Sequence, residues 1–230
     1  IKNKNNKFKF IQVSTDEVYG SVSKGSSKEN ALLTPNSPYA ASKTSADHLI
    51  FSFFKTYNFP SIITRSSNNY GPYQFPEKLI PLIILNALQE KKLPIYGHGK
   101  QIRNWLYVND NAKAIHQIYL KGKVGNTYNI GGDDELTNNK LVLKICKILD
   151  LIVPRKNNKK YNSLITHVED RPGHDKRYAL DSSKLIKKLK WKPKTNFLDG
   201  INKTFIWYLG NKKYYRSLNK KDIIKRMGKI

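Results

Sequence analysis

Residues 8–20 read FKFIQVSTDEVYG and lead from an apolar stretch into a cluster of polar side chains. The β-prone, largely apolar residues 8–13 predict a strand. Two adjacent carboxyls beside a hydroxyl are costly to bury, so we expect the strand to end there. In open α/β sheets ligands bind outside the carboxyl ends of strands, the position predicted for Asp16 and Glu17. Taken alone, the stretch also fits a polar loop with a solvated acid pair.

The rest of the chain alternates between strand and helix patterns, which is typical of an α/β protein. Ser37 and Pro38 have the residue types of a helix N-cap and first turn. Further helices are expected over 77–88 (interrupted by Pro81), 110–120, 137–149, 182–189 and 197–209, and strands over 61–64, 93–96, 105–108, 126–130 and 164–168.

Composition excludes several classes of site. The 230 residues carry a formal charge of +25, which favours loose attraction to polyanions. Most of the 42 basic residues are lysine, whereas a sequence-specific nucleic-acid reader would use more arginine.

Cys146 is the single cysteine and the five histidines are scattered, so we expect neither disulfides nor a metal site. The longest apolar run, 79–85, is too short to cross a bilayer. With no apolar leader at residues 1–9, these features predict a cytoplasmic protein.

Tyr39 and Lys43 lie four residues apart near a helix start, which places both on one helix face. A tyrosine has a pKa near ~10, and a nearby cation stabilises its phenolate. Lys43 would therefore lower the pKa of Tyr39 and let Tyr39 act as a base. Lys43 would also be available to bind a ribose hydroxyl. Such pairs are common, and an ordinary helix face is the alternative interpretation.

Two further stretches carry donors suited to a phosphorylated sugar. Residues 170–175 read DRPGHD, in which Arg171 and His174 offer donors to a diphosphate. Residues 68–72 read NNYGP, and their amides follow another predicted strand. A surface turn is the alternative interpretation for residues 170–175.

Taken together and in order, six motifs resemble the dTDP-glucose 4,6-dehydratases, a group of extended short-chain dehydrogenases/reductases. The adjacent acids after a threonine discriminate this group from epimerase and decarboxylase relatives, which share the Tyr/Lys pair. The resemblance runs from about residue 8 to 209. The motifs are STDEVYG (14–20), SPYAASK (37–43), NNYGPYQFPEKLIP (68–81), RNWLYV (103–108), YNIGG (128–132) and DRPGHD (170–175).

The resemblance implies the carboxyl-terminal portion of a Rossmann-like, doubly wound parallel sheet and a smaller α/β substrate-binding domain. We expect the truncated NAD-binding domain over 1–72, a mainly nucleotide-sugar-binding domain over 73–209 with some segments returning to the sheet, and a basic tail over 210–230. The Gly-rich dinucleotide fingerprint of the family is missing, along with roughly a hundred residues of βα units. The strand near residues 8–14 would then have an open edge.

By resemblance, the reaction converts dTDP-glucose into dTDP-4-dehydro-6-deoxyglucose through transient oxidation by NAD. Tyr39, supported by Lys43 and Thr15, would take the proton of the C4 hydroxyl. Glu17 would remove the C5 proton while Asp16 protonates the departing C6 hydroxyl. The two carboxyls must then hold opposite protonation states.

The family also implies a set of contact residues. Ser14, Tyr39, Lys43 and Asn69 would contact NAD. The nucleotide-sugar would be bound by Thr15, Asn68, Lys78, Leu79, Pro94, Ile95, Tyr96, Arg103, Asn138, Asp170, Arg171, Pro172, Gly173 and His174.

Family resemblance further suggests a homodimer through the helix that contains Tyr39. Without the pyrophosphate-binding helix, NAD affinity should collapse, so we expect no activity unless a separate polypeptide supplies the amino-terminal half. We expect no specific nucleic-acid or membrane partner. Two alternatives stay open: a sibling dehydratase or epimerase acting on a UDP-sugar, and an inactive basic fragment.

Overall fold

The computed structural model describes residues 8–216, and the chain divides into two compact units. Unit 1 comprises residues 1–69, 103–135 and 175–194, and unit 2 the remainder. Two segments after residue 72, 103–135 and 175–194, belong to unit 1. The assignment of the two domains to NAD and to the nucleotide-sugar stays a prediction. The tail expected over 210–230 begins with α7 (Lys212–Arg216), and its remaining residues lie outside the described part of the chain.

Unit 1 is built on a parallel sheet in the order β1-β2-β6. These strands are β1 (Phe10–Thr15), β2 (Ser61–Ser66) and β6 (Thr127–Ile130). Thr15 pairs with Ser66 at their carboxyl ends. β1 lies at an edge of this sheet, and among the described residues no strand pairs with its outer side. The predicted α/β class and the predicted open edge are both present.

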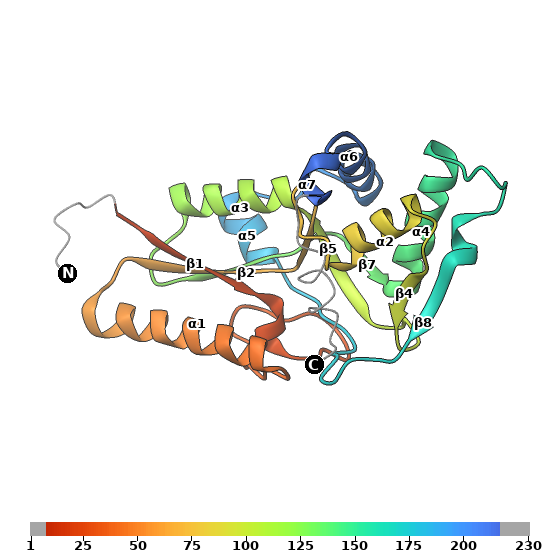
Figure 1. The fold of residues 1–230 in the computed structure, drawn as a ribbon. Helices are drawn as coiled ribbons and strands as arrows, with labels where there is room; N and C mark the ends of the chain where they lie inside the picture. Colours follow the sequence, from red (N-terminus) through yellow and green to blue (C-terminus); the bar gives the residue numbers. More distant parts are fainter. Residues whose placement is uncertain (1–7, 217–230) are drawn as a thin grey trace. The chain divides into compact units, whose positions relative to one another are not determined.

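Helices cover both faces of this sheet (Figure 1). On one face lies α1 (Pro38–Tyr57), and on the other α3 (Val108–Lys121) and α5 (Ser183–Leu189). The Ser37 side chain accepts a hydrogen bond from the Ala40 N–H at 3.1 Å, so the predicted cap forms. The buried core beside α3 and α5 consists of Ile62, Leu106, Ala114, Ile118, Tyr128, Ile130, Leu185, Leu189 and Trp191.

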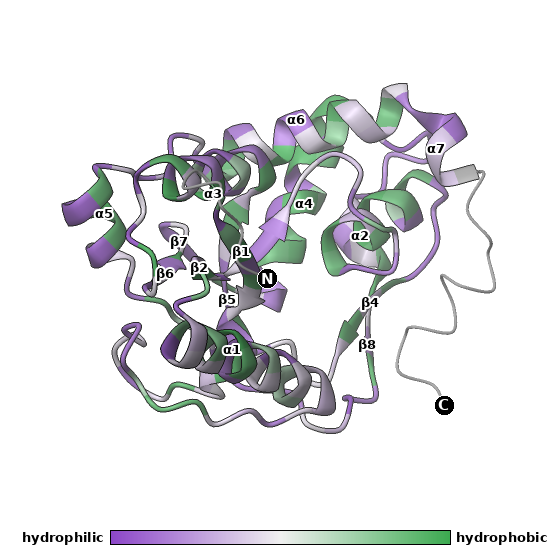
Figure 2. Ribbon diagram, turned by 90° about the vertical axis from the view of Figure 1, so that its left-hand side faces the viewer, coloured by the Kyte–Doolittle hydropathy of each residue, from purple (hydrophilic) through white to green (hydrophobic). Residues whose placement is uncertain are grey.

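Unit 2 contains the parallel pair β4 (Leu93–Tyr96) and β8 (Ile165–Val168). Beside them are α2 (Leu79–Leu88), α4 (Asn138–Ile152), α6 (Phe197–Gly210) and the 3₁₀ turn η2 (Tyr161–Leu164). The apolar α2 stands out in Figure 2 and packs against β4, α4 and α6. Pro81 does not interrupt α2, because it lies in the first turn, where its missing N–H costs no helical hydrogen bond.

Three short strands carry the chain from one unit into the other. They are β3 (Asn68–Tyr70), β5 (Ile102–Tyr107) and β7 (Asp134–Thr137). The polar residues 66–74 and 133–137 did not predict β3 or β7. Among the described residues no helix is long and apolar enough to cross a membrane.

Candidate active site

The acid pair follows β1 directly. Thr15 ends the strand, and Asp16 begins the 3₁₀ turn η1 (Asp16–Tyr19). The Thr15 hydroxyl donates to Asp16 Oδ1 at 3.2 Å and accepts from the Glu17 N–H at 3.3 Å. Asp16 is only 3% exposed, so the alternative interpretation as a solvated acid pair is wrong for Asp16. The strand ends where it was predicted to end, but Thr15 and Asp16 at this point are still buried in unit 1.

Burial changes the acidity of Asp16. Desolvation, helped by the charge of Glu17, raises the pKa of Asp16 to about 7. The Thr15 hydrogen bond and the charge of Arg103 oppose this shift. Asp16 therefore keeps its proton to much higher pH than an ordinary aspartic acid, which suits a proton donor.

Tyr39 lies in the first turn of α1, and its side chain is exposed. Partial burial raises its pKa, and the charges of Glu17 and Asp16 raise it further. The Tyr39 phenol therefore lies close enough to Asp16 and Glu17 to interact with both electrostatically, as predicted for a common site.

The expected lowering of the Tyr39 pKa by Lys43 is not found. The Lys43 ammonium donates to the Val13 carbonyl oxygen at 2.7 Å, and the two carboxyls dominate the field at Tyr39. Lys43 thus joins α1 to the strand that carries the acids, and in this structure the Tyr39 phenol stays protonated at neutral pH.

Arg103 lies in the same neighbourhood. It is 5% exposed, donates to the Asp175 carbonyl oxygen at 2.9 Å and stands 4.2 Å above the Tyr178 ring centroid. Burial and the charge of Glu17 raise the pKa of Tyr178, whose hydroxyl donates to Asp175 Oδ2 at 2.6 Å. The sequence predicted Arg103, whereas nothing in the pattern pointed to Tyr178.

Buried polar atoms without a partner follow both β1 and β2, whose last residues pair with each other. Asp16 Oδ2, Ser67 Oγ and Asn68 Oδ1 are buried without a hydrogen-bond partner among the described residues. Leaving buried polar atoms unsatisfied is costly, so such atoms at one strand edge are a signature of a ligand site. The predicted Asn69 follows, and its amide donates to the Ser67 carbonyl oxygen at 3.0 Å.

A buried network, missed by sequence reasoning, holds both sides of the acid pair. Asp47 of α1 accepts from Arg65 Nε at 2.9 Å and from the Ser14 hydroxyl at 3.0 Å. Arg65 also donates to the Tyr19 hydroxyl, which donates to Asn129 Oδ1, both at 2.8 Å. The Ser14 hydroxyl, predicted to contact NAD, is thus directed to Asp47 in this structure. Asp47 lies one turn after Lys43, which is the one sequence signal that could have found it.

Other predicted residues belong to unit 2 and form a group of their own. Asp170 accepts from His174 Nδ1 at 2.6 Å, from Gln101 Nε2 at 2.8 Å and from the Arg171 N–H at 2.9 Å. The Tyr96 ring meets the His174 ring edge-on, with centroids 6.4 Å apart. Gln101 was not predicted, because no pattern distinguishes it.

The remaining unit 2 residues vary in exposure. Lys78 is exposed and pairs with Glu77 at 3.2 Å, and the backbone N–H of buried Asn138 donates to the Gln101 carbonyl oxygen at 3.0 Å. Ile95 is a core residue at 1% exposure, and its contact with the nucleotide-sugar stays a prediction. Leu79, Pro94 and Tyr96 are half-buried, whereas Pro172 and Gly173 are exposed.

Comparison with known proteins identifies relatives along nearly the whole chain. The sequence profile described as GDP-mannose 4,6 dehydratase matches residues 1–204. A dTDP-glucose 4,6-dehydratase of Salmonella typhimurium is 50% identical over 227 residues, which cover 94% of this chain and 62% of that protein. The chain thus spans about three fifths of the length of this curated relative.

Solved structures agree with this fold. The dTDP-glucose 4,6-dehydratase of Bacillus anthracis, crystallised in complex with NAD, has a TM-score of 0.83 and 47% identity over 92% of this chain and 65% of that one. A UDP-glucuronic acid 4-epimerase of Bacillus cereus, in complex with UDP-glucuronic acid and NAD, has a TM-score of 0.78 and 29% identity over 88% of this chain and 62% of its own. The chain therefore has the fold of these enzymes and is closer in sequence to the dehydratase.

Proposed function

The chain belongs to the GDP-mannose 4,6 dehydratase family, and on that premise we propose that it carries the acid–base machinery of an NAD-dependent dTDP-glucose 4,6-dehydratase. The observation that carries the proposal is the buried Asp16, next to Glu17 and within the electrostatic reach of Tyr39. Dehydration of a 4-keto sugar needs a base and an acid together, and adjacent carboxyls in different surroundings meet that need.

The proposed first step is removal of the sugar's C4 hydroxyl proton by Tyr39 as the C4 hydride leaves. When bound, NAD⁺ supplies the hydride acceptor and a positive charge close to the phenol. That charge, added to Lys43, opposes the effect of the two carboxyls on the Tyr39 pKa. We propose that Tyr39, which is exposed, and Lys43, which is anchored to β1, bind the nicotinamide riboside end. The buried, unsatisfied Ser67 hydroxyl adds a polar group that fits the same end.

The second step is loss of water across C5 and C6. The new 4-ketone acidifies C5, so Glu17 takes the C5 proton. Asp16, with its raised pKa, gives a proton to the departing C6 hydroxyl. Return of the hydride to C6 and of a proton to C5 completes the reaction without net redox change. Arg103, Asn68 and the Tyr96–Asp170–His174 group are proposed to bind the nucleotide-sugar.

Activity further requires a glycine-rich dinucleotide-binding segment, which these 230 residues do not contain. The open edge of β1, where Val13 is 48% exposed, is suited to receive a strand of such a segment. We propose that such a segment completes the NAD site.

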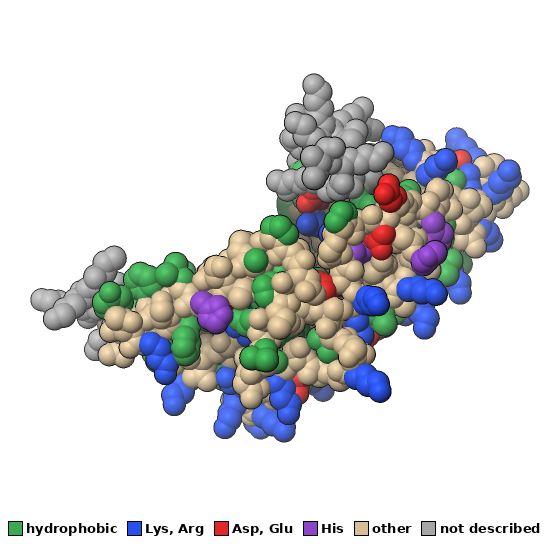
Figure 3. All heavy atoms as spheres, turned by 90° about the horizontal axis from the view of Figure 1, so that it is seen from below, with side chains coloured by type: hydrophobic (Ala, Val, Ile, Leu, Met, Phe, Trp, Pro, Cys, Tyr) green, Lys and Arg blue, Asp and Glu red, His purple; other side chains and the backbone are tan. Residues whose placement is uncertain are grey.

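The exposed apolar face of α1 supports the proposed homodimer. Leu49, Phe53 and Tyr57 are 57%, 43% and 71% exposed, although their helical spacing predicts packing. Figure 3 shows hydrophobic side chains on this side of the molecule. Light scattering tests the pairing: wild type should have twice the chain mass and a Leu49→Asp/Phe53→Asp variant the mass of one chain. A monomeric wild type would contradict it.

The test of function combines the chain with an amino-terminal glycine-rich segment, NAD⁺ and either dTDP-glucose or UDP-glucose. Mass spectrometry should show loss of one water from dTDP-glucose and far less from UDP-glucose, and Tyr39→Phe should remove the activity. Preference for UDP-glucose would support the sibling enzyme, and turnover by the chain alone would refute the need for the added segment.

A further inference from the structure

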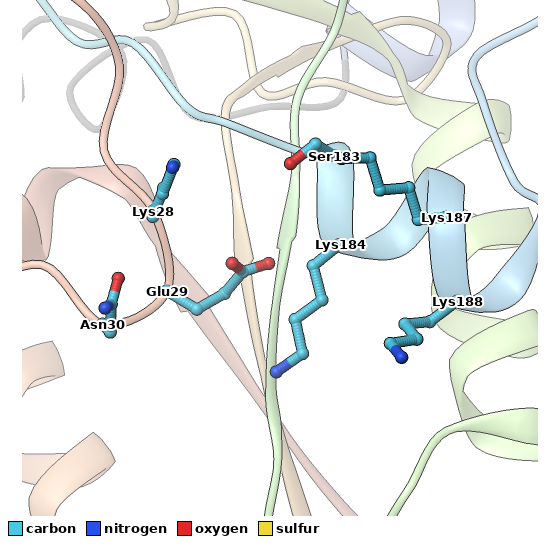
Figure 4. Close-up of a pocket in the computed structure, with 7 residues that line it drawn as sticks. All are labelled: Lys28, Glu29, Asn30, Ser183, Lys184, Lys187 and Lys188. Atoms are coloured by element: carbon cyan, nitrogen blue, oxygen red, sulfur yellow. The ribbon is translucent and has the colours of Figure 1, made fainter.

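A cavity of about 390 Å³ lies in unit 1 between the loop at residues 28–30 and helix α5. Its volume lies within the range of small-molecule sites. Figure 4 shows Lys28, Glu29 and Asn30 on one wall and the α5 side chains on the other, with the Glu29 carboxylate pointing toward α5. The α5 residues that line it are Ser183, Lys184, Lys187 and Lys188. None of these seven residues takes part in the proposed dehydration.

The two walls are joined by backbone hydrogen bonds. The Ser27 N–H donates to the Ala179 carbonyl oxygen and the Asp181 N–H to the Ser27 carbonyl oxygen, both at 2.9 Å. The buried Asn129 side chain donates to the Ser27 carbonyl oxygen at 2.9 Å and to that of Asp181 at 3.3 Å. The loop and the start of α5 therefore form a fixed frame, which lowers the ordering cost of binding.

The lining is strongly positive. Four lysines and one glutamate line the cavity, and Glu29 already accepts a hydrogen bond from the Asn129 N–H at 3.0 Å. Lys184 Nζ is held by Asn126 Oδ1 at 3.0 Å and the Thr127 carbonyl oxygen at 2.8 Å. Burial lowers the Lys184 pKa, and the charge of Glu29 opposes that shift. One lysine is thus fixed by the protein, while the others stand on exposed positions of both walls.

The field of these lysines converges on a neighbouring group. Hydrogen bonds from Ser183 lower the pKa of Asp181, and the charges of Lys28 and Lys187 lower it further. Lys28 stands on the loop wall and Lys187 on α5, so both walls contribute positive potential to the same place. A ligand carrying several negative charges would be attracted by the lysines of both walls and repelled by the carboxylates of Glu29 and Asp181, so it needs more than one charge to gain.

We propose that this cavity binds a small oligophosphate anion, independently of the proposed dehydratase reaction. Lysine ammonium groups bind phosphate as point charges without the fixed planar geometry that arginine imposes, which suits a flexible chain of phosphates. A ligand with a single carboxylate would be repelled by Glu29, and its one negative charge would gain too little from the lysines to offset that repulsion. The joined walls and the volume fit a ligand of a few phosphate groups better than a long polymer.

The test titrates the full chain with sodium tripolyphosphate at constant ionic strength, using calorimetry and amide NMR shifts. Lys28→Gln/Lys187→Gln should weaken binding about tenfold, because two of the four ammonium groups are lost. Lys156→Gln/Lys159→Gln is the matched control: it removes the same charge from exposed positions outside the cavity and should leave affinity within about twofold. Shifts should be concentrated at residues 27–30 and 181–188.

Three outcomes would overturn the proposal. Equal weakening in both double variants would show unspecific attraction to the net charge of +25. Shifts at residues 170–174, abolished by excess dTDP, would place the anion at the proposed substrate site. Binding of a single-stranded oligonucleotide with tripolyphosphate ineffective would identify a polymer site. None of these readouts uses turnover, so failure of the proposed enzyme activity leaves this test unaffected.

Discussion

Asp47 in unit 1 and Asp170 in unit 2 both accept hydrogen bonds from a basic side chain, but their surroundings differ. The Asp47 side chain is 1% exposed and is bound by Arg65 and Ser14. The Asp170 side chain is 40% exposed and is bound by His174 and Gln101. Burial raises the Asp170 pKa, but the hydrogen bonds from His174 and the Arg171 N–H lower it below its usual value overall.

This difference matches the work proposed for each region. Proton transfer in unit 1 needs a fixed geometry and a shifted pKa, and burial provides both for Asp16. Recognition of a nucleotide in unit 2 needs donors that a ligand can reach, and the turn at residues 170–174 offers them near solvent. Disruption of unit 1 should therefore affect chemistry and stability, whereas changes in unit 2 should affect affinity.

The largest effect is expected from Glu17→Gln in the completed enzyme. Loss of the base should lower turnover by about 10²–10⁴-fold while leaving the first oxidation in place. Stopped-flow absorbance should then show NADH forming without release of product, and deuterium from solvent should no longer enter at C5. Loss of the oxidation step together with turnover would contradict the assigned role of Glu17.

Two carboxylate neutralisations compare a buried with a more exposed ion pair inside unit 1. Asp47→Asn leaves the buried Arg65 uncompensated and should lower the free energy of unfolding by about 3–5 kcal/mol. Glu135→Gln breaks the ion pair between Glu135 and Arg177. Because the Glu135 side chain is 39% exposed, the free energy of unfolding should fall by about 1 kcal/mol or less. Urea unfolding measures both. Equal costs would remove the argument that the buried network fixes the site.

Sequence reasoning found the α/β class, the cap at Ser37 and the polar end of β1, because each depends on local residue types. It also predicted the helix from Thr137, whose hydroxyl accepts from the Lys140 N–H at 3.2 Å. It missed Arg65 as the partner of Asp47, because their pairing depends on how α1 packs on β2. The burial of Ile95 could not be predicted for the same reason, since an apolar strand residue lies in a core or at a surface according to tertiary packing.

Asp16 links the chemistry of unit 1 to its stability. Its folded-state pKa of about 7 exceeds the ordinary value of 3.8, so the folded state binds more protons between these pH values. Stability should therefore fall as pH rises from about 4 to 7, by on the order of 2–4 kcal/mol from this group. Asp16→Asn should flatten this part of the profile. Urea unfolding at pH 4.5 and 7.5 checks it, and carboxyl ¹³C NMR should locate the titration near pH 7 in the wild type alone.

The smallest effect is expected in unit 2, where His174→Ala should weaken binding of dTDP to the chain about tenfold, as loss of one donor to a diphosphate does. Its free energy of unfolding should fall by about 1–2 kcal/mol, less than in Asp47→Asn, because the His174 side chain is 7% exposed but the Asp170 carboxylate left behind is 40% exposed. Calorimetry measures the affinity, and His116→Ala, at an exposed position of α3, is the control. The opposite result is that His174→Ala lowers stability as much as Asp47→Asn does, while the affinity per folded molecule stays constant. The turn at residues 170–174 would then be a structural element like the buried network of unit 1, and the contrast between the two regions would fail.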